Sequence, residues 1–97
     1  MKKFIYLHYG FTQPTPEIME QWGKWFESIA PNTINRGAHF THGIEISAAG
    51  TKDLPLERDS ITGYNIIEAD SMDEAVKLAQ TNPYIDSIRI YEMMTEQ

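Results

Sequence analysis

The sequence contains no cysteine. This absence excludes disulfide bonds, zinc sites with thiolate ligands and thiol nucleophiles, and it fits either redox compartment. Phosphate-binding loops, the glycine pattern of dinucleotide-binding folds and the nucleophile elbow of serine hydrolases are also missing. Nucleotide hydrolysis, dinucleotide redox chemistry and serine hydrolysis therefore have no support, and we expect no cofactor.

Basic residues are few. The chain has eight lysines and arginines against fourteen aspartates and glutamates, which gives a formal net charge of -6. Such a chain repels a phosphate backbone, so we expect no nucleic-acid partner. No stretch approaches the roughly 18 consecutive apolar residues of a membrane span, and the N-terminus lacks the cleavage site of a signal peptide. The sequence therefore predicts a cytoplasmic protein with no membrane partner.

The 97 residues predict one small domain, 1–97, which is organised around residues 61–83. Residues 61–69 are rich in β-branched and aromatic side chains and predict a buried strand. Ser71 and Glu74 have the spacing of a capping box, in which the carboxylate reaches back to the cap's own amide, so a helix is expected to begin there. Pro83 forces the preceding residue out of helical geometry, so this helix should end near Thr81 or Asn82.

The other elements follow from periodicity and from turn residues. Residues 3–9 and 85–94 predict the first and last strands, and residues 17–30 predict a helix with Thr15 as its N-cap and Pro16 at its first position. Residues 38–47 predict another strand, at the sheet edge, with a bulge expected at Gly43. Residues 48–60 mix glycine, proline and charge without a period, which is typical of the loop of a wide hairpin.

This order predicts an α+β fold of the ferredoxin-like βαββαβ type, with a four-stranded antiparallel sheet and two helices on one face. The other face is then bare. We expect it to carry Phe4, Tyr6, Tyr91 and Met93, an apolar surface that a monomer seldom exposes to water. The sequence therefore predicts a homodimer through the sheet face, a dimeric α/β barrel.

Two stretches carry a resemblance to a known family. Residues 63–75 read GYNIIEADSMDEA, and they are followed by Asn82-Pro83-Tyr84 and by a closing strand with IRIY at 88–91. With the opening strand, these features resemble the YCII-related family of small bacterial proteins, which implies a dimeric α/β barrel. Family members for which catalysis has been proposed carry a histidine in the first helix and an aspartate before the proline. The matching positions hold Trp22 and Asn82, so the resemblance supplies no acid or base.

His8 is the best single candidate for a catalytic group, because it ends a central strand where a pocket would open. The alternative is a histidine that is hydrogen-bonded within a dimer interface. Arg89 can bind a carboxylate or enolate as a bidentate fork, or it can pair with a neighbouring acidic side chain. Trp22 belongs to a helical stripe that usually packs against a sheet. The candidate ligand-binding residues are Tyr6, Trp22, His42, Tyr64, Arg89 and Tyr91.

His39 and His42 have a metal-ligand spacing for a helix, but on a strand their rings point to opposite faces, so we expect no metal site. Two functions remain open. One is a homodimer that binds a small organic molecule, with acid-base activity of the lyase or isomerase type. The other is a non-catalytic dimeric module for regulation or assembly.

Overall fold

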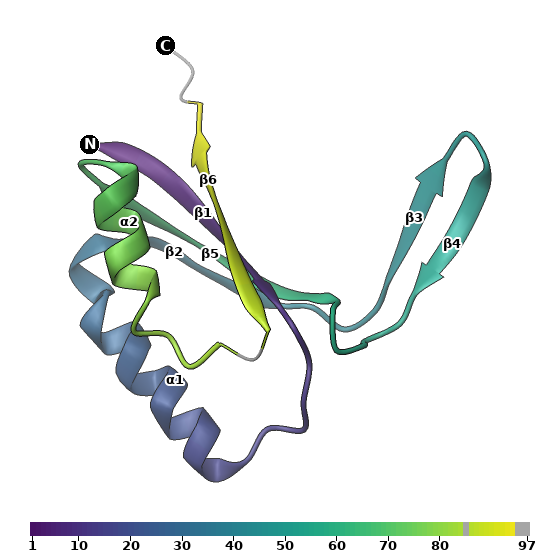
Figure 1. The fold of residues 1–97 in the computed structure, drawn as a ribbon, viewed down its shortest axis with the longest axis horizontal. Coiled ribbons are helices and arrows are strands. Elements are labelled where there is room, and N and C mark those ends of the chain that lie inside the picture. The colour runs from purple at the N-terminus through teal and green to yellow at the C-terminus, as the bar shows by residue number, and fades with distance from the viewer. Residues whose placement is uncertain (85, 95–97) are drawn as a thin grey trace.

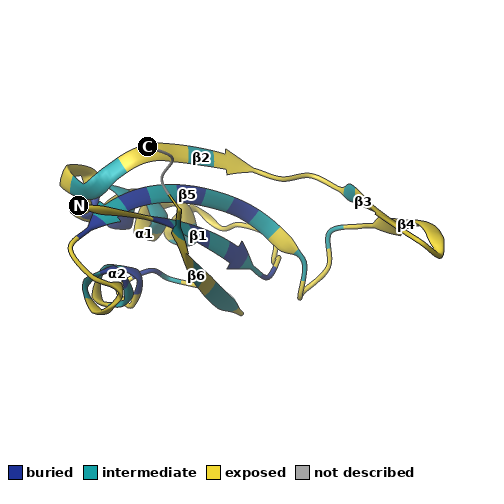
Figure 2. Ribbon diagram, turned by 90° about the horizontal axis from the view of Figure 1, so that it is seen from above, coloured by how far each residue is buried: buried dark blue, intermediate teal, exposed yellow. Residues whose placement is uncertain are grey.

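Four strands form one antiparallel sheet, and two helices cover one of its faces (Figure 1, Figure 2). The structure is a computed structural model, which describes residues 1–84 and 86–94. The strand order in the sheet is β2-β5-β1-β6. This arrangement confirms the predicted α+β class. The elements are, in order, β1 (Lys2–Tyr9), α1 (Pro16–Ser28), the short helix η1 (Ala30–Asn32), β2 (Thr33–His39), β3 (Gly43–Ser47), β4 (Gly50–Leu54), β5 (Ile61–Ala69), α2 (Met72–Ala79) and β6 (Ser87–Met93).

Helix α1 begins where the sequence predicts. The Thr15 hydroxyl accepts a hydrogen bond from the amide of Ile18 at 3.2 Å, and Pro16 occupies the first turn, where it has no amide to leave unpaired. The helix ends at Ser28, and η1 follows it directly. The predicted end at Ala30 is therefore late by two residues, because the chain tightens into a 3₁₀ turn before β2.

Helix α2 begins at the predicted capping box. The Ser71 hydroxyl accepts from the amide of Glu74 at 3.2 Å, while the Glu74 carboxylate accepts from the amide of Asp70 at 2.9 Å, one residue before the predicted donor. The helix stops at Ala79, slightly before the predicted end. Strand β6 lies within the predicted range 85–94, and Ile85, where that range begins, lies outside the described residues.

A second, two-stranded sheet replaces the predicted loop of a wide hairpin. Strands β3 and β4 pair with each other, and Figure 1 shows them projecting away from the main sheet. The chain reverses tightly because Gly50 adopts a φ of 116°, with Ser47 and Gly50 as register partners. The prediction of a loop over residues 48–60 is therefore wrong at Gly50–Leu54, which form β4. Its sequence GTKDL is exposed throughout and carries no alternating apolar pattern that would have revealed a strand.

Strand β2 starts earlier than predicted and contains the irregularity of the sheet edge. It begins at Thr33, whereas the sequence predicted a strand over 38–47, and the chain leaves the main sheet after His39. Its register against β5 shifts on both sides of Asn35, and Gly37 adopts a φ of 74°. The bulge thus lies near Gly37 and not at Gly43.

The two faces of β1 are the reverse of the prediction. Phe4 and Tyr6 are 0% exposed because they lie under the helices, whereas Ile5 and Leu7 lie on the open face. Both sides of this strand are apolar, so periodicity alone could not choose between them. Tyr6 determines which face is buried, because its hydroxyl donates to the carbonyl of Ala75 in α2.

The hydrophobic core lies between the helices and the sheet. Trp25 in α1 is 2% exposed, and its indole nitrogen donates to the carbonyl of Leu78 in α2 at 2.9 Å, which ties the two helices together. Within the described residues, no helix is both long and apolar enough to cross a membrane. The buried apolar residues are Phe4, Tyr6, Trp25, Ile29, Ile67, Ala69, Ala75 and Ala79.

Candidate functional site

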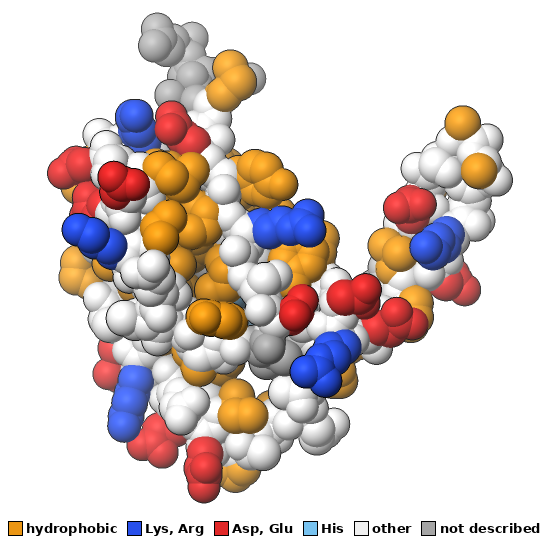
Figure 3. Space-filling model, viewed as in Figure 1, with side chains coloured by type: hydrophobic (Ala, Val, Ile, Leu, Met, Phe, Trp, Pro, Cys, Tyr) orange, Lys and Arg blue, Asp and Glu red, His pale blue; other side chains and the backbone are white. Residues whose placement is uncertain are grey.

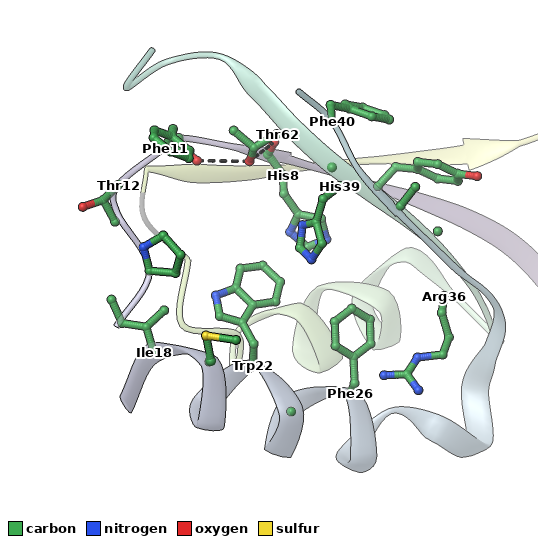
Figure 4. Close-up of a pocket in the computed structure, with 18 residues that line it drawn as sticks. His8, Phe11, Thr12, Ile18, Trp22, Phe26, Arg36, His39, Phe40 and Thr62 are labelled. Carbon is green, nitrogen blue, oxygen red and sulfur yellow. Dashed lines mark hydrogen bonds between the residues drawn. The ribbon is translucent and has the colours of Figure 1, made fainter. Parts of the chain in front are cut away.

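A cavity of about 670 Å³ opens between α1 and the adjoining parts of β1, β2 and β5. Figure 4 shows Ile18, Trp22 and Phe26 rising from α1 toward the sheet. His8 and His39 point from the sheet toward the helix. The volume lies in the range of small-molecule sites, and the walls are largely apolar and aromatic, as such sites usually are.

The two histidines reach the cavity because a glycine lies between them. His8 in β1 and His39 in β2 are both register partners of Gly63 in β5, so the three residues form one row across the sheet. A Cβ atom on Gly63 would lie 2.9 Å from the carbonyl oxygen of Ala38 and 3.7 Å from Nδ1 of His39. A side chain at this position would therefore disturb the row, and its absence leaves room beside both imidazoles.

His8 is held in a defined orientation. Its Nε2 lies 2.7 Å from Oδ1 of Asn65, a side chain that is 0% exposed. An amide oxygen can only accept, so Nε2 carries the proton and Nδ1 is the unprotonated acceptor of the neutral ring. Nδ1 is buried and has no hydrogen-bond partner among residues 1–84 and 86–94. A buried acceptor without a donor is costly, which makes it a candidate contact for a ligand.

The charge state of His8 follows from its surroundings. Burial lowers the pKa of His8 below its usual value, and the nearby His39 lowers it further, while the hydrogen bond with Asn65 acts in the opposite direction. The ring therefore stays neutral at neutral pH. A neutral imidazole is able to accept a proton, which is the state that a general base needs.

Aromatic rings enclose this imidazole. The ring centroids of Trp22 and Trp25 lie 5.1 and 5.8 Å from that of His8, both in edge-to-face arrangements. Tyr6 lies 6.5 Å away, on the core side. Burial raises the pKa of the Tyr6 hydroxyl, with a smaller contribution from the Glu74 carboxylate, so Tyr6 remains a donor to the main chain. The rotamer of His8 is thus fixed by packing as well as by its hydrogen bond.

The structure brings three of the predicted site residues to the cavity, namely His8, Trp22 and Tyr64. Tyr64 is the register partner of Leu7 on the open face, and its ring stacks on Phe40, another residue of the cavity lining.

The other four predicted site residues lie elsewhere. Tyr6 lies beneath the helices, next to His8. His42 is exposed on the link between β2 and β3. Arg89 and Tyr91 lie on the open face, where the Arg89 guanidinium is 4.6 Å from the centroid of the Tyr9 ring.

Most residues of the site were not among the predicted ones, and these include Arg36, His39, Phe26 and Asn65. Asn65 had a visible signal, because it is a polar amide between Tyr64 and Ile66 in the middle of the predicted buried strand over 61–69. Arg36 had none, since the bulge in β2 that directs it is not visible in the sequence. Among residues 1–84 and 86–94, no Asp or Glu lines the cavity, and no three His, Asp or Glu side chains form a group able to hold a metal ion.

No model of a known protein family matches the chain, and no curated protein matches it.

Proposed function

We propose that this protein binds a small, largely apolar organic molecule in the cavity, with Nδ1 of His8 accepting a proton or hydrogen bond from it. The observation that carries the proposal is the buried His8 ring, whose Nε2 is committed to Asn65 while Nδ1 has no partner among the described residues. We further propose that His39, which is exposed and lines the same cavity, changes its rotamer and so opens a path from the cavity to Nδ1.

The same arrangement supports acid-base chemistry of the lyase or isomerase type. A proton removed from the ligand would pass to Nδ1, and the resulting imidazolium would keep its Nε2–H bond to the Asn65 oxygen, a charge-assisted bond that stabilises it. The ring could then return the proton to a different atom of the ligand. No carboxylate of the described residues lines the cavity, so His8 would act without an acidic orienting partner.

We further propose membership of the YCII-related family. The strand and helix order and the capped start of α2 agree with that resemblance. Trp22 lines the cavity, and it occupies the position of the family's proposed histidine. If the chain is a member, its chemistry must depend on a residue from the sheet, and of the two histidines that the sheet directs to the cavity His8 is the buried one.

The first prediction concerns His8 and a set of bicyclic phenols. We expect a naphthol to raise the thermal unfolding midpoint of the native protein, and we expect His8→Phe to weaken its binding roughly tenfold, since one hydrogen bond is lost. Phenylalanine retains an aromatic ring but offers no acceptor. Binding should be measured by isothermal titration calorimetry. His42→Phe is the matched control, because His42 is exposed and lies outside the cavity.

The control variant should bind the naphthol as the native protein does. If no naphthol binds, or if His8→Phe and His42→Phe bind it equally well, the proposal is wrong.

The second candidate function is a non-catalytic dimeric module, and a specific surface favours a dimer. The open face of the sheet carries Ile5, Leu7, Tyr91 and Met93, and Tyr91 is 53% exposed. The projecting hairpin exposes more apolar surface, with Ile44 at 61% and Ile46 at 81%, and Figure 3 shows it set apart from the body. A lone hairpin is marginally stable in water, so a second copy that covers both surfaces would stabilise it.

We therefore predict a dimer in sedimentation velocity at micromolar concentration. Tyr91→Glu places a charge on the open face, and it should raise the dissociation constant of the dimer at least tenfold and so favour the monomer. Tyr84→Glu is the matched control, because Tyr84 is 55% exposed but lies beside α2 on the helix side. A native protein that remains monomeric at these concentrations contradicts the homodimer.

A further inference from the structure

We infer that the ligand of this cavity is an anion, an aromatic carboxylate whose charged group pairs with Arg36 while its ring packs against α1. This inference rests on the proposed function, since it names the chemical class that the same cavity would bind. It comes from the charges around the cavity, the placement of Arg36 and the rings between Arg36 and His8.

The charges around the cavity differ from those of the chain as a whole. The chain has fourteen acidic and eight basic residues. Among the described residues that line the cavity, however, there are Arg36, His8 and His39 but no aspartate or glutamate. Because the His8 ring is neutral, Arg36 supplies the fixed positive charge, and with no acidic side chain beside it among the described lining residues it creates a local attraction for negative charge.

The bulge in β2 directs Arg36 into this cavity. Thr33 faces the helices, because its hydroxyl donates to the carbonyl of Ile29, and regular alternation would then turn Arg36 to the open face. The register shifts on both sides of Asn35 instead, and the Asn35 side chain accepts from the amide of Gly37 at 2.7 Å. The strand therefore changes phase, and Arg36 faces α1.

The guanidinium of Arg36 is held in place by an aromatic ring, but no carboxylate of the described residues pairs with it. Its Cζ lies 5.0 Å from the centroid of the Phe26 ring, a cation–π contact that holds the side chain against the cavity wall (Figure 4). No carboxylate of residues 1–84 and 86–94 forms a salt bridge with it. Because a guanidinium binds a carboxylate through two parallel hydrogen bonds, this group is suited to the acid end of a ligand.

The rings of α1 favour an aromatic ligand body. Phe26 and Trp22 lie side by side on the helix, with centroids 6.1 Å apart, and Figure 4 shows Arg36 beside Phe26 and His8 facing Trp22. A planar ligand that packs on these two rings would direct one end toward Arg36 and the other toward His8. A hydroxylated aromatic carboxylate meets both, because its acid group reaches Arg36 and its hydroxyl donates to His8.

The test compares a hydroxynaphthoic acid with its neutral amide, which has nearly the same shape but no charge. Isothermal titration calorimetry on the full chain at neutral pH should show at least tenfold tighter binding of the acid. Arg36→Gln should remove that preference, so that the acid binds no better than the amide, while binding of the amide stays unchanged. Arg58→Gln is the matched control, because Arg58 lies outside the cavity, and it should behave as the native protein.

The outcomes separate the two proposals. If acid and amide bind equally and His8→Phe weakens both, the cavity binds a ligand through His8 and the assignment of an anion is overturned. If Arg36→Gln weakens acid and amide to the same extent, Arg36 has only a structural role and the assignment is also overturned. If neither compound binds the native protein, the proposed function and this inference fall together.

Discussion

Trp25→Ala is expected to lower the free energy of unfolding by about 3–5 kcal/mol, the cost of emptying a buried tryptophan site. Trp25 is 2% exposed, and its ring centroid lies 6.0 Å from that of Tyr6 and 5.0 Å from that of Phe26. The variant also leaves the carbonyl of Leu78 without its donor. Since a small domain has about 5–15 kcal/mol in total, this change alone should remove a large part of its stability.

Urea denaturation followed by far-ultraviolet circular dichroism measures this effect. If Trp25→Ala is unfolded before urea is added, Trp25→Phe provides a milder measurement, because it keeps most of the apolar volume while it removes the indole donor to Leu78.

Trp22→Ala is the matched control in the same helix. Trp22 is half-buried and lines the cavity, so its removal should cost less than half as much stability and should instead weaken ligand binding. Equal losses of stability in the two variants would contradict this division between a core tryptophan and a cavity tryptophan.

The sequence pattern of α1 could not make that division. Its stripe of apolar residues places Trp22 and Trp25 on the same side of the helix, and the general expectation for such a stripe is packing. The cavity lies between the sheet and the part of α1 that contains Ile18 and Trp22. Trp25 therefore meets Tyr6 and the core, whereas Trp22 meets the cavity. Local periodicity contains no information on where along a helix the tertiary contact ends.

Elements with a local cause were predictable. Pro16 and the cap at Thr15 define the start of α1, and the hydroxyl of Ser71 defines that of α2. The order of these elements was enough to predict the four-stranded sheet and the placement of both helices on one of its faces. The place of His8 at the end of a central strand, where it lines the cavity, was predictable for the same reason.

Features that depend on tertiary contacts were not predictable. The faces of β1 were assigned in reverse, since both are apolar and the choice depends on a carbonyl in α2 that is 69 positions from Tyr6. Arg36 faces the cavity because the bulge in β2 reverses the alternation of its side chains between the two faces, and no pattern of apolar residues in the sequence indicates this bulge. Arg89, which the sequence offered for the acid end of a ligand, lies on the opposite side of the sheet.

Gly37→Ala is expected to destabilise the protein by about 3 kcal/mol or more, from the combined cost of a left-handed backbone and of overpacking. Gly37 has a φ of 74°, and a Cβ atom there would lie 1.6 Å from the carbonyl oxygen of Tyr64 and 2.6 Å from its carbonyl carbon. Both atoms belong to the backbone of β5, which cannot move aside without breaking its pairing. The bulge of β2 must therefore rearrange.

The matched control is Gly23→Ala in the middle of α1. A Cβ atom at Gly23 would meet nothing within 4 Å, and alanine is the better helix former, so this variant should gain about 0.5–1 kcal/mol. Urea midpoints of the two variants should therefore move in opposite directions from that of the native protein. Because the same bulge directs Arg36 toward Phe26, folded Gly37→Ala should also lose the preference for an acid over its amide. A Gly37→Ala protein with native stability would show that β2 adopts another path, and Arg36 would then have no structural reason to face the cavity.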